Sequence, residues 1–257
     1  MPRFSANLGF LWQDLPLADA IRAAHSAGFD AVECHWPYDE PLDAVKTALS
    51  GTALPMLGLN TRRGDTTAGE NGLAAVPGRT DDARAAIDEA IDYGAEIGAG
   101  AVHVMAGFAT GPEAERTFRA NLEHACTRAT DHSMTILIEP LNHYDAPGYF
   151  LSTTGHAERI ISDVGAPNLK LMFDCYHVQL MEGDISRRLA RLLPVIGHIQ
   201  LASVPDRGPP GQGELNYAHI FAEIDRLGYT APLGAEYKPG GPTEATLKWL
   251  ESARQPV

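Results

Sequence analysis

Basic residues are scarce in this sequence. Its 257 residues include 20 Lys and Arg against 33 Asp and Glu, which gives a formal net charge of -13. Nucleic acids and anionic membrane surfaces repel a chain of this charge. We therefore expect neither of them as a partner.

Long hydrophobic runs and cysteines are also lacking. No apolar stretch approaches the roughly 20 residues of a membrane-spanning helix, and the chain begins with a strand-like segment instead of a hydrophobic signal sequence. The few cysteines are widely spaced and form no C-x-x-C pair, which favours buried, reduced thiols and a cytoplasmic location. They are Cys34, Cys126 and Cys175.

What the sequence does contain is a regular alternation of strand-like and helix-like segments. Alternation of this kind predicts parallel strands joined by crossover helices. Eight such units in about 250 residues predict an α/β fold with a single (β/α)8 TIM-barrel domain over residues 1–257. Strands are expected at 4–8, 30–35, 54–60, 101–105, 135–139, 169–174, 196–201 and 233–237, and eight helices at 17–27, 42–49, 83–97, 112–132, 154–164, 186–193, 217–227 and 243–252.

An open, doubly wound sheet is the rival architecture. It usually carries a Gly-rich phosphate-binding turn, G-x-G-x-x-G, after its first strand. Residues 7–12 read N-L-G-F-L-W and lack this motif. The closed barrel is therefore the better prediction.

Metal-capable side chains stand at the ends of four successive predicted strands. The apolar run 136–138 ends in Glu139, and the next three strands carry Asp174, Gln200 and Glu236, each about one βα unit further on. The carboxyl ends of barrel strands meet at one rim, where active sites of such barrels lie. Carboxylate and amide oxygens suit hard cations, so the four side chains are predicted ligands of Mg²⁺ or Mn²⁺.

Several residues near these strand ends are candidates for substrate binding. Arg207 and Lys238 are cations that would pair with an anionic substrate. His177 follows Asp174 by three residues, and His143 lies in the loop after Glu139. The roles of further rim residues stay open at this point; they are Arg62, Arg63, His35, Glu70 and Glu214.

Two glutamates facing one divalent ion suggest proton transfer at carbon. The ion would polarise a carbonyl and the neighbouring hydroxyl. One carboxylate, Glu139 or Glu236, would remove the proton next to the carbonyl, and a carboxylate would return it to the adjacent carbon through an enediolate. This chemistry predicts an aldose–ketose type isomerase or a sugar epimerase.

Short motifs along the chain are characteristic in combination. They are R-F-S-A-N-L at 3–8, P-Y-D at 37–39, G-L-A-A-V-P-G-R at 72–79, I-E-P-L-N at 138–142, F-D-C-Y-H at 173–177, M-E-G at 181–183, G-H-I-Q at 197–200, G-Q-G-E-L-N-Y at 211–217 and E-Y-K-P at 236–239. Through these motifs the chain resembles, over nearly its whole length, the hydroxypyruvate isomerase family, which belongs to the xylose-isomerase-like barrels and includes 2-oxo-tetronate isomerases. The resemblance implies metal ligands at Glu139, Asp174, Gln200 and Glu236, with Glu139 and Glu236 as the proton-transfer pair.

Two details of the resemblance bear on the substrate. Related ketose 3-epimerases usually carry His where Gln200 stands, so Gln200 favours the hydroxypyruvate isomerase branch. Residues 34–36 (C-H-W) and 59–63 (L-N-T-R-R) depart from that branch and are candidates to line the substrate pocket.

The resemblance implies isomerisation of hydroxypyruvate to tartronate semialdehyde, with 2-oxo-tetronate isomerase or ketose 3-epimerase as alternatives. The expected substrate is a small anionic keto acid, and a homo-oligomer is compatible with the sequence. Two further hypotheses compete with an isomerase or epimerase function. A hydrolytic endonuclease of the same superfamily would need a His-rich zinc site and a basic face, and a non-catalytic sugar-acid binding protein would need no proton-transfer pair.

Overall fold

Eight parallel strands form the centre of the computed structural model, which describes residues 2–254. Met1 and residues 255–257 of the predicted domain lie outside the described residues. The strands are β1 (Phe4–Asn7), β2 (Ala31–Glu33), β3 (Leu59–Asn60), β4 (Ala101–His103), β5 (Thr135–Ile138), β6 (Leu169–Asp174), β7 (Ile196–Leu201) and β8 (Leu233–Ala235).

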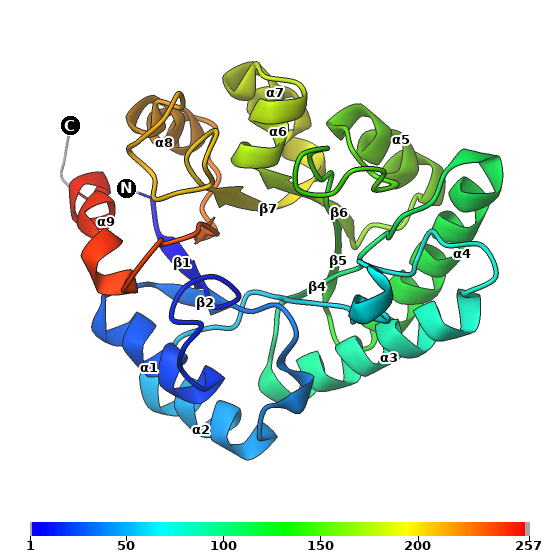
Figure 1. Ribbon diagram of the computed structural model, residues 1–257, viewed down its shortest axis with the longest axis horizontal. Coiled ribbons are helices and arrows are strands. Elements are labelled where there is room, and N and C mark those ends of the chain that lie inside the picture. Colours follow the sequence, from blue (N-terminus) through cyan, green and yellow to red (C-terminus); the bar gives the residue numbers. More distant parts are fainter. Residues whose placement is uncertain (1, 255–257) are drawn as a thin grey trace.

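The sheet closes on itself. Its strand order is β2-β1-β8-β7-β6-β5-β4-β3, so β2 and β3 stand at its two ends. Backbone hydrogen bonds join these ends: the Leu57 N–H donates to the Val32 carbonyl at 2.7 Å, and the Cys34 N–H donates to the Gly58 carbonyl at 3.1 Å. The result is the predicted (β/α)8 barrel, which Figure 1 shows end-on with its helices around the outside.

Nine α-helices within residues 2–254 cover the barrel. Their apolar faces follow the predicted spacing, as in the first helix, where Leu17, Ile21 and Ala24 are buried. The helices are α1 (Leu17–Ser26), α2 (Leu42–Thr52), α3 (Thr80–Ile97), α4 (Gly111–Thr130), α5 (Thr154–Val164), α6 (Cys175–Met181), α7 (Ile185–Leu192), α8 (Tyr217–Arg226) and α9 (Lys248–Ala253). Short 3₁₀ helices are η1 (Pro37–Asp39), η2 (Thr66–Ala68), η3 (Leu193–Val195) and η4 (Thr243–Thr246).

Helix α6 is absent from the sequence prediction of eight helices, which was wrong on this point. The helix begins directly after Asp174, whose carboxylate caps it by accepting a hydrogen bond from the Tyr176 N–H at 2.8 Å. Its seven residues are too short to display a helical period. The cap also matters for function, because it fixes one oxygen of a predicted metal ligand.

Two other predicted segments differ from the structure. The strand expected at 54–60 is regular only at Leu59–Asn60, because Pro55 offers no N–H for pairing and the preceding residues make only an isolated bridge from Met56 to Val32. The helix expected at 243–252 is divided into η4 and α9. At the division, the Thr246 hydroxyl donates to the Thr243 carbonyl and competes with regular helical bonding.

The main hydrophobic core lies between the barrel and its helices. Phe4 of β1, for example, packs edge-to-face against Phe221 of α8 and Trp249 of α9, with ring centroids 5.2 and 5.1 Å apart. Inside the barrel, a separate apolar cluster is small and consists of Ala101, Leu137 and Met172. The rest of the interior toward the carboxyl ends is therefore left to polar side chains.

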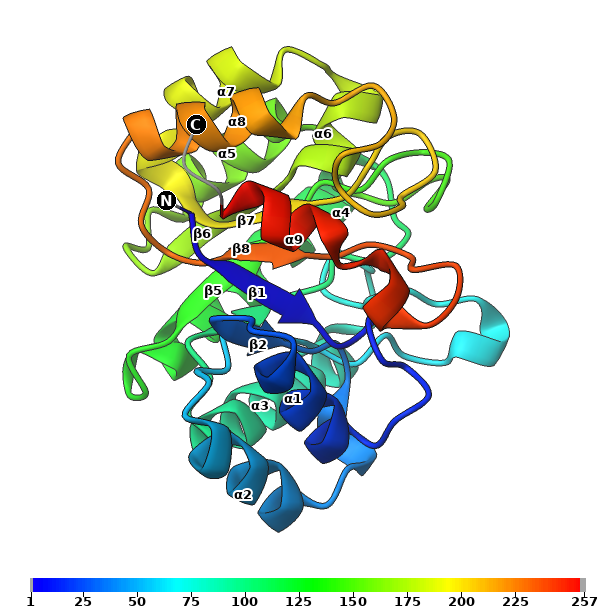
Figure 2. The same ribbon diagram turned by 90° about the vertical axis from the view of Figure 1, so that its left-hand side faces the viewer.

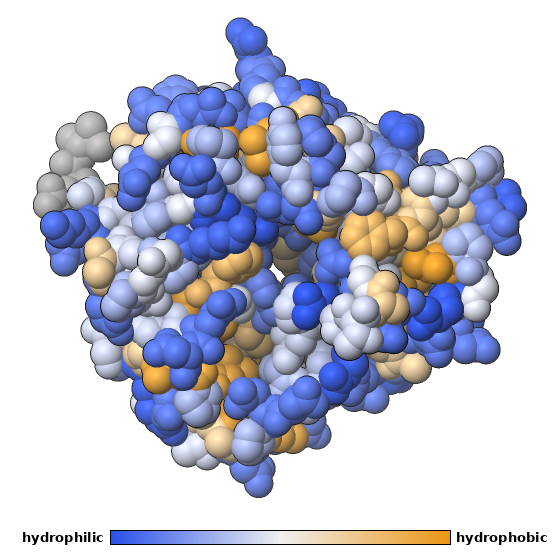
Figure 3. All heavy atoms as spheres, viewed as in Figure 1, coloured by the Kyte–Doolittle hydropathy of each residue, from blue (hydrophilic) through white to orange (hydrophobic). Residues whose placement is uncertain are grey.

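The carboxyl ends of the strands and the long loops gather on one face. Figure 2 shows the strands from the side, with the loops after β1 and β8 extending beyond their arrowheads. The space-filling view of this face is hollowed at its centre, above the barrel (Figure 3). In the described part of the chain, no helix combines the length and the apolar character that crossing a membrane requires.

Gly234 gives a test of how tightly the barrel interior is packed. A Cβ at this position would lie 2.6 Å from Glu33 Oε1 and 2.8 Å from both Gln200 Cγ and His198 Nε2. Gly234→Ala is therefore expected to lower the free energy of unfolding by about 1–3 kcal/mol through overpacking. Urea unfolding of the purified protein measures this change.

Gly51 in α2 is the matched control, because a Cβ there meets nothing within 4 Å. Gly51→Ala should raise the free energy of unfolding by about 0.5–1 kcal/mol through helix propensity. Equal effects of the two substitutions would contradict a tightly packed interior.

Candidate active site

The four predicted metal ligands all lie buried at the carboxyl rim of the barrel. Asp174 ends β6 and pairs in register with Gln200 of β7, which in turn pairs with Gly234 of β8, two residues before Glu236. Glu139 directly follows β5, the neighbour of β6. Each of the four side chains is at most 6% exposed.

Three of these side chains carry a buried oxygen that accepts no hydrogen bond from the described residues. Glu139 Oε1, Asp174 Oδ2 and Gln200 Oε1 have no hydrogen-bond partner among the residues described. Buried polar atoms are almost always paired, because leaving one unpaired costs about 1–3 kcal/mol. Three such oxygens on three adjacent strands are the donor set that a hard divalent cation requires, so these residues fit the predicted Mg²⁺ or Mn²⁺.

Glu236, the fourth predicted ligand, is held differently. Its Oε1 accepts hydrogen bonds from Asn7 Nδ2 at 3.1 Å and from His35 Nε2 at 2.9 Å. Its Oε2 accepts one from Arg207 at 2.8 Å. The carboxylate is therefore fixed in position by β1, by the segment after β2 and by the loop after β7.

This environment shifts the pKa values of Glu139 and Glu236 in opposite directions. Burial raises the pKa of Glu139 well above its ordinary value, and the negative charges of Glu236 and Asp174 raise it further. Burial by itself would also raise the pKa of Glu236, but the Arg207 guanidinium and the His35 ring lower it overall. A cation beside Glu139 would stabilise its charged form as Arg207 stabilises that of Glu236.

His177, predicted to bind substrate, lies in the same cluster. Atoms of Glu139, Asp174 and His177 lie within 4.8 Å of one another, close enough to surround one ion. The backbone N–H of Asn142, however, donates to His177 Nδ1 at 3.0 Å, so the neutral ring carries its hydrogen on Nε2. Burial and the nearby charge of Arg207 lower the pKa of His177 well below its ordinary value and keep the ring neutral.

His177 Nε2 is therefore a hydrogen-bond donor that faces the site. It lies 3.8 Å from Glu139 Oε1 and 3.6 Å from Asp174 Oδ2, and no described residue accepts a hydrogen bond from it. A protonated ring nitrogen cannot coordinate a metal. This geometry suits a group that donates to a substrate oxygen.

Arg207 is the buried cation of the site. Its guanidinium lies between two aromatic rings, 4.7 Å from the centroid of Phe10 and 5.0 Å from that of Tyr176. Besides Glu236, it approaches Asp174 Oδ2 at 3.6 Å. Its Nε has no acceptor in the part of the chain that the structure describes, so one donor is free for a ligand.

Two other predicted substrate-binding residues stand outside the buried cluster. His143 is exposed in the loop after β5, with its ring against Tyr144. Lys238 is also exposed, and only its backbone N–H contacts the site, by donating to the Arg207 carbonyl at 2.7 Å. Their binding of substrate remains a prediction from the sequence.

The residues with open roles also have places in the structure. Arg62 pairs with Glu89 at 2.7 Å on the outside of the barrel. Arg63 lies over the ring of Trp36 at 3.9 Å, with no carboxylate within salt-bridge distance among the residues described. Glu70 pairs with Arg79 and ties down its own loop, and Glu214 is exposed.

Sequence reasoning missed the polar residues that support the ligands from β1 and β2. Glu33 is 4% exposed inside the barrel, and Asn7 is 2% exposed beside it. A charge at the end of the apolar segment A-V-E is the same signal that revealed Glu139, and it was present for Glu33. Two histidines are also buried here, His103 at 3.7 Å from Glu139 and His198 at 2.6 Å from Glu33.

Comparisons with known proteins agree with this architecture. A family model described as "Xylose isomerase-like TIM barrel" matches residues 21–253. The chain is 43% identical to the 2-oxo-tetronate isomerase of Cupriavidus necator over 98% of each chain. It is 37% identical to the hydroxypyruvate isomerase of Escherichia coli over 99% of this chain and 100% of the relative.

A solved structure is similar over the same length. The crystal structure named as AP endonuclease, family 2, from Brucella melitensis superimposes with a TM-score of 0.95 at 37% identity. The match covers 99% of this chain and 100% of that chain.

Arg207 provides a test of the electrostatics of this site. Removing it leaves Glu236 and Asp174 buried without their cation, and loss of one partner from a buried ion pair costs about 3–5 kcal/mol. Arg207→Gln should therefore strongly lower the free energy of unfolding of the chelator-treated protein in urea. Arg62 is the control, because it also lies over a ring, that of Tyr38, and pairs with carboxylates but is 42% exposed. Arg62→Gln should cost at most about 1 kcal/mol, and a similar cost for both variants would contradict the proposed role of Arg207.

Proposed function

This chain belongs to the hydroxypyruvate isomerase family of xylose isomerase-like TIM barrels and is an isomerase, and from this premise we propose a metal-assisted reaction on a small α-keto hydroxy acid. The three unpaired oxygens of Glu139, Asp174 and Gln200 carry the proposal. They are the donors expected for Mg²⁺ or Mn²⁺, with Glu236 as the fourth ligand.

Hydroxypyruvate is the first candidate substrate, with tartronate semialdehyde as its product. A 2-oxo-tetronate, one carbon longer, is the second candidate, and the 43% identity to a protein named for that activity favours it. The segments that depart from the hydroxypyruvate isomerase pattern lie side by side here. Trp36 donates from its ring N–H to the Thr61 carbonyl at 3.1 Å, and Arg63 lies over the ring of Trp36. These residues are candidates to distinguish the two substrates.

Conversion of hydroxypyruvate requires one hydrogen to move between two carbons. We assign its removal from C3 to Glu236, because this carboxylate is ionised and held by Asn7, His35 and Arg207. We assign delivery of a proton to C2 to Glu139, which must be protonated when the substrate binds. After each turnover Glu236 releases the proton that it took to solvent and Glu139 regains one from solvent, so the pair is reset. The C3 hydroxyl loses its proton and the C2 oxygen gains one, so the atoms balance, and the Nε2–H of His177 is the donor facing that oxygen.

The remaining parts of the site fit an anionic substrate. A divalent cation held by the four ligands would polarise the substrate carbonyl and hydroxyl and stabilise the developing negative charge. The free Nε donor of Arg207 suits the substrate carboxylate. Lys238 and His143 are exposed at the rim, where they would contact the substrate as it enters the site.

The alternatives are weaker on particular observations. A ketose 3-epimerase is disfavoured by Gln200, and an uncharged ketose would have no use for the free donor of Arg207. A nuclease is disfavoured by the net charge of -13 and by the oxygen-rich ligand set. A non-catalytic binding protein would not need two glutamates in one cluster. We propose that the protein has no nucleic-acid or membrane partner. We also propose a cytoplasmic location, which is in keeping with three buried free cysteines. A homo-oligomer is compatible with this function.

Removal of the metal should remove the activity. Prolonged EDTA treatment followed by desalting is expected to abolish turnover of hydroxypyruvate or of a 2-oxo-tetronate, and Mg²⁺ or Mn²⁺ should restore it. A coupled assay of product formation measures both steps. Full turnover after thorough chelation, verified by elemental analysis, would contradict the metal-assisted reaction.

Replacement of the assigned base should stop hydrogen exchange. In D₂O the wild-type enzyme is expected to incorporate deuterium into its substrate, whereas Glu236→Gln should reduce this rate by a factor of about 100 or more. Proton NMR follows the exchange. Turnover rates of hydroxypyruvate, 2-oxo-tetronates and C4–C6 ketoses are compared, and the substrate that is converted fastest identifies the substrate class. Glu115→Gln is the control, because Glu115 pairs with His156 at 2.9 Å on the outer helices. Exchange by Glu236→Gln at the wild-type rate would overturn the assignment.

A further inference from the structure

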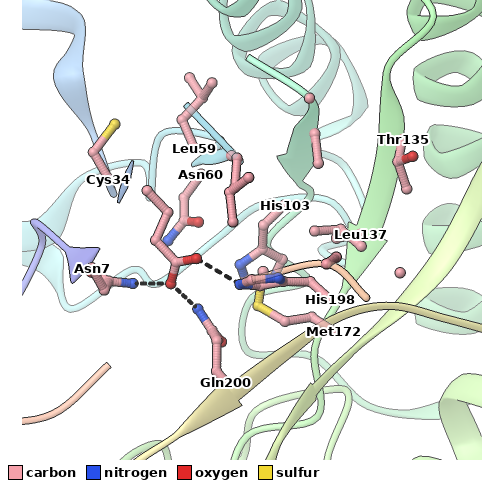
Figure 4. A pocket seen from close by; sticks show the side chains of 17 residues that line it. Asn7, Cys34, Leu59, Asn60, His103, Thr135, Leu137, Met172, His198 and Gln200 are labelled. Carbon is pink, nitrogen blue, oxygen red and sulfur yellow. Dashed lines mark hydrogen bonds and ion pairs between the residues drawn. The ribbon is translucent and has the colours of Figure 1, made fainter. Parts of the chain in front are cut away.

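A buried carboxylate inside the barrel has no part in the reaction described above. Glu33, at the end of β2, accepts three hydrogen bonds from side chains. Asn7 Nδ2 donates to its Oε1 at 3.0 Å, Gln200 Nε2 donates to the same oxygen at 2.9 Å, and His198 Nε2 donates to its Oε2 at 2.6 Å. In Figure 4, dashed lines run from the labelled Asn7, His198 and Gln200 to one carboxylate, which these hydrogen bonds identify as that of Glu33. The four residues line a cavity of about 140 Å³.

The contact with Gln200 determines which way its amide points. A carboxylate only accepts hydrogen bonds, so the –NH₂ group of Gln200 must face Glu33 and the carbonyl oxygen must face away. That oxygen, Oε1, is buried without a partner in the described structure. Because Gln200 pairs in register with Asp174, which also carries an unpaired oxygen, the two side chains project from neighbouring strands on the same face of the sheet. A reversed amide would present N–H groups to a cation and repel it.

The position of Glu33 is itself tightly fixed. His198 and Asn7 hold its two oxygens, and Asn7 Nδ2 also lies 3.1 Å from Glu236 Oε1, which links Glu33 to a second predicted ligand. The absence of a side chain at Gly234 leaves the space in which these groups meet, since a Cβ there would lie 2.6 Å from Glu33 Oε1. The carboxylate has therefore little freedom to release the amide.

We propose that Glu33 is a positioning residue that orients the Gln200 amide so that its carbonyl oxygen faces the divalent cation. This inference rests on the metal-assisted function proposed above and adds to it a residue that would not touch the cation. Outer hydrogen-bond partners of metal ligands typically contribute 10–100-fold to metal affinity. A carboxylate is a suitable partner for an amide ligand, because it leaves the amide only one orientation.

Exchanging the two side chains tests the proposal. Glu33→Gln should weaken Mn²⁺ binding about 10–100-fold, because an amide at position 33 accepts or donates and no longer selects one orientation of Gln200. Gln200→Glu should also weaken binding, because it places two carboxylates side by side. The double variant Glu33→Gln/Gln200→Glu should bind Mn²⁺ nearly as well as the wild type, because the hydrogen bond between the two positions is restored with donor and acceptor exchanged.

Mn²⁺ affinity is measured by electron paramagnetic resonance or calorimetry on chelator-treated protein, without substrate. Thermal unfolding of each metal-free variant reports whether it is folded. Glu115→Gln is the matched control, since it neutralises a carboxylate that is also paired with a histidine but lies outside the barrel. This variant should bind Mn²⁺ with wild-type affinity.

The outcomes separate this inference from the function on which it rests. If the wild type binds no Mn²⁺, both fall. If the wild type binds Mn²⁺ and Glu33→Gln binds it equally well, or Gln200→Glu alone binds at least as tightly as the wild type, only the role of Glu33 is overturned. Should Glu33→Gln fail to fold, Gln200→Glu and the double variant still decide, because an orienting role requires the double variant to bind better than Gln200→Glu.

Discussion

The repulsion between buried carboxylates at one end of the barrel is the constraint on which the rest of the site depends. Glu33, Glu139, Asp174 and Glu236 are each at most 6% exposed. Buried like charges are unfavourable unless cations or hydrogen-bond donors stabilise them. Each carboxylate in this cluster is accordingly surrounded by a different set of partners, and the differences between these sets determine what each can do.

Glu33 and Glu236 are satisfied by the protein, and Glu139 is not. Glu33 accepts from three side chains, and Glu236 accepts from Asn7, His35 and Arg207. Among the described residues, the ion-pair partners of Glu139 are His103 and His177, at 3.7 and 3.8 Å, which is beyond hydrogen-bonding distance. The protein thus fixes Glu33 and Glu236 firmly and leaves one oxygen each of Glu139, Asp174 and Gln200 without a hydrogen-bond partner among the described residues. Unpaired buried oxygens lower stability at the rim, and the proposed cation would offset that loss.

The hydrogen-bond network also assigns direction to groups that would otherwise be ambiguous. Asn142 fixes the tautomer of His177, so that an N–H faces the site. Glu33 similarly fixes the amide of Gln200, so that a carbonyl oxygen faces the other ligands. The two orientations are opposite in polarity, one donor and one acceptor, as expected where a substrate oxygen and a cation are bound side by side. Residues in the barrel wall therefore determine which group of the site is a hydrogen-bond donor and which is an acceptor.

Sequence patterns were sufficient to predict the barrel and to bring four candidate metal ligands together at one rim. Strict alternation of strands and helices leaves few topologies other than the barrel, and parallel strands carry their carboxyl ends to one rim. Glu139, Asp174, Gln200 and Glu236 could therefore be placed together from their positions at strand ends. Local signals failed where an element was short or irregular, as in helix α6 and strand β3.

The contacts between side chains on opposite sides of the barrel could not be predicted and came from the folded structure. Asn7 contacts Glu236 across 229 residues of sequence, His35 contacts it across 201, and Glu33 contacts Gln200 across 167. Sequence separation carries no information about such contacts, because closure of the barrel sets the distances between non-adjacent strands. The direction of an amide, the tautomer of a histidine and the pairing of Arg207 depend on those distances. The sequence thus supplies residue types that can bind a metal. The folded barrel determines the direction in which their side chains point.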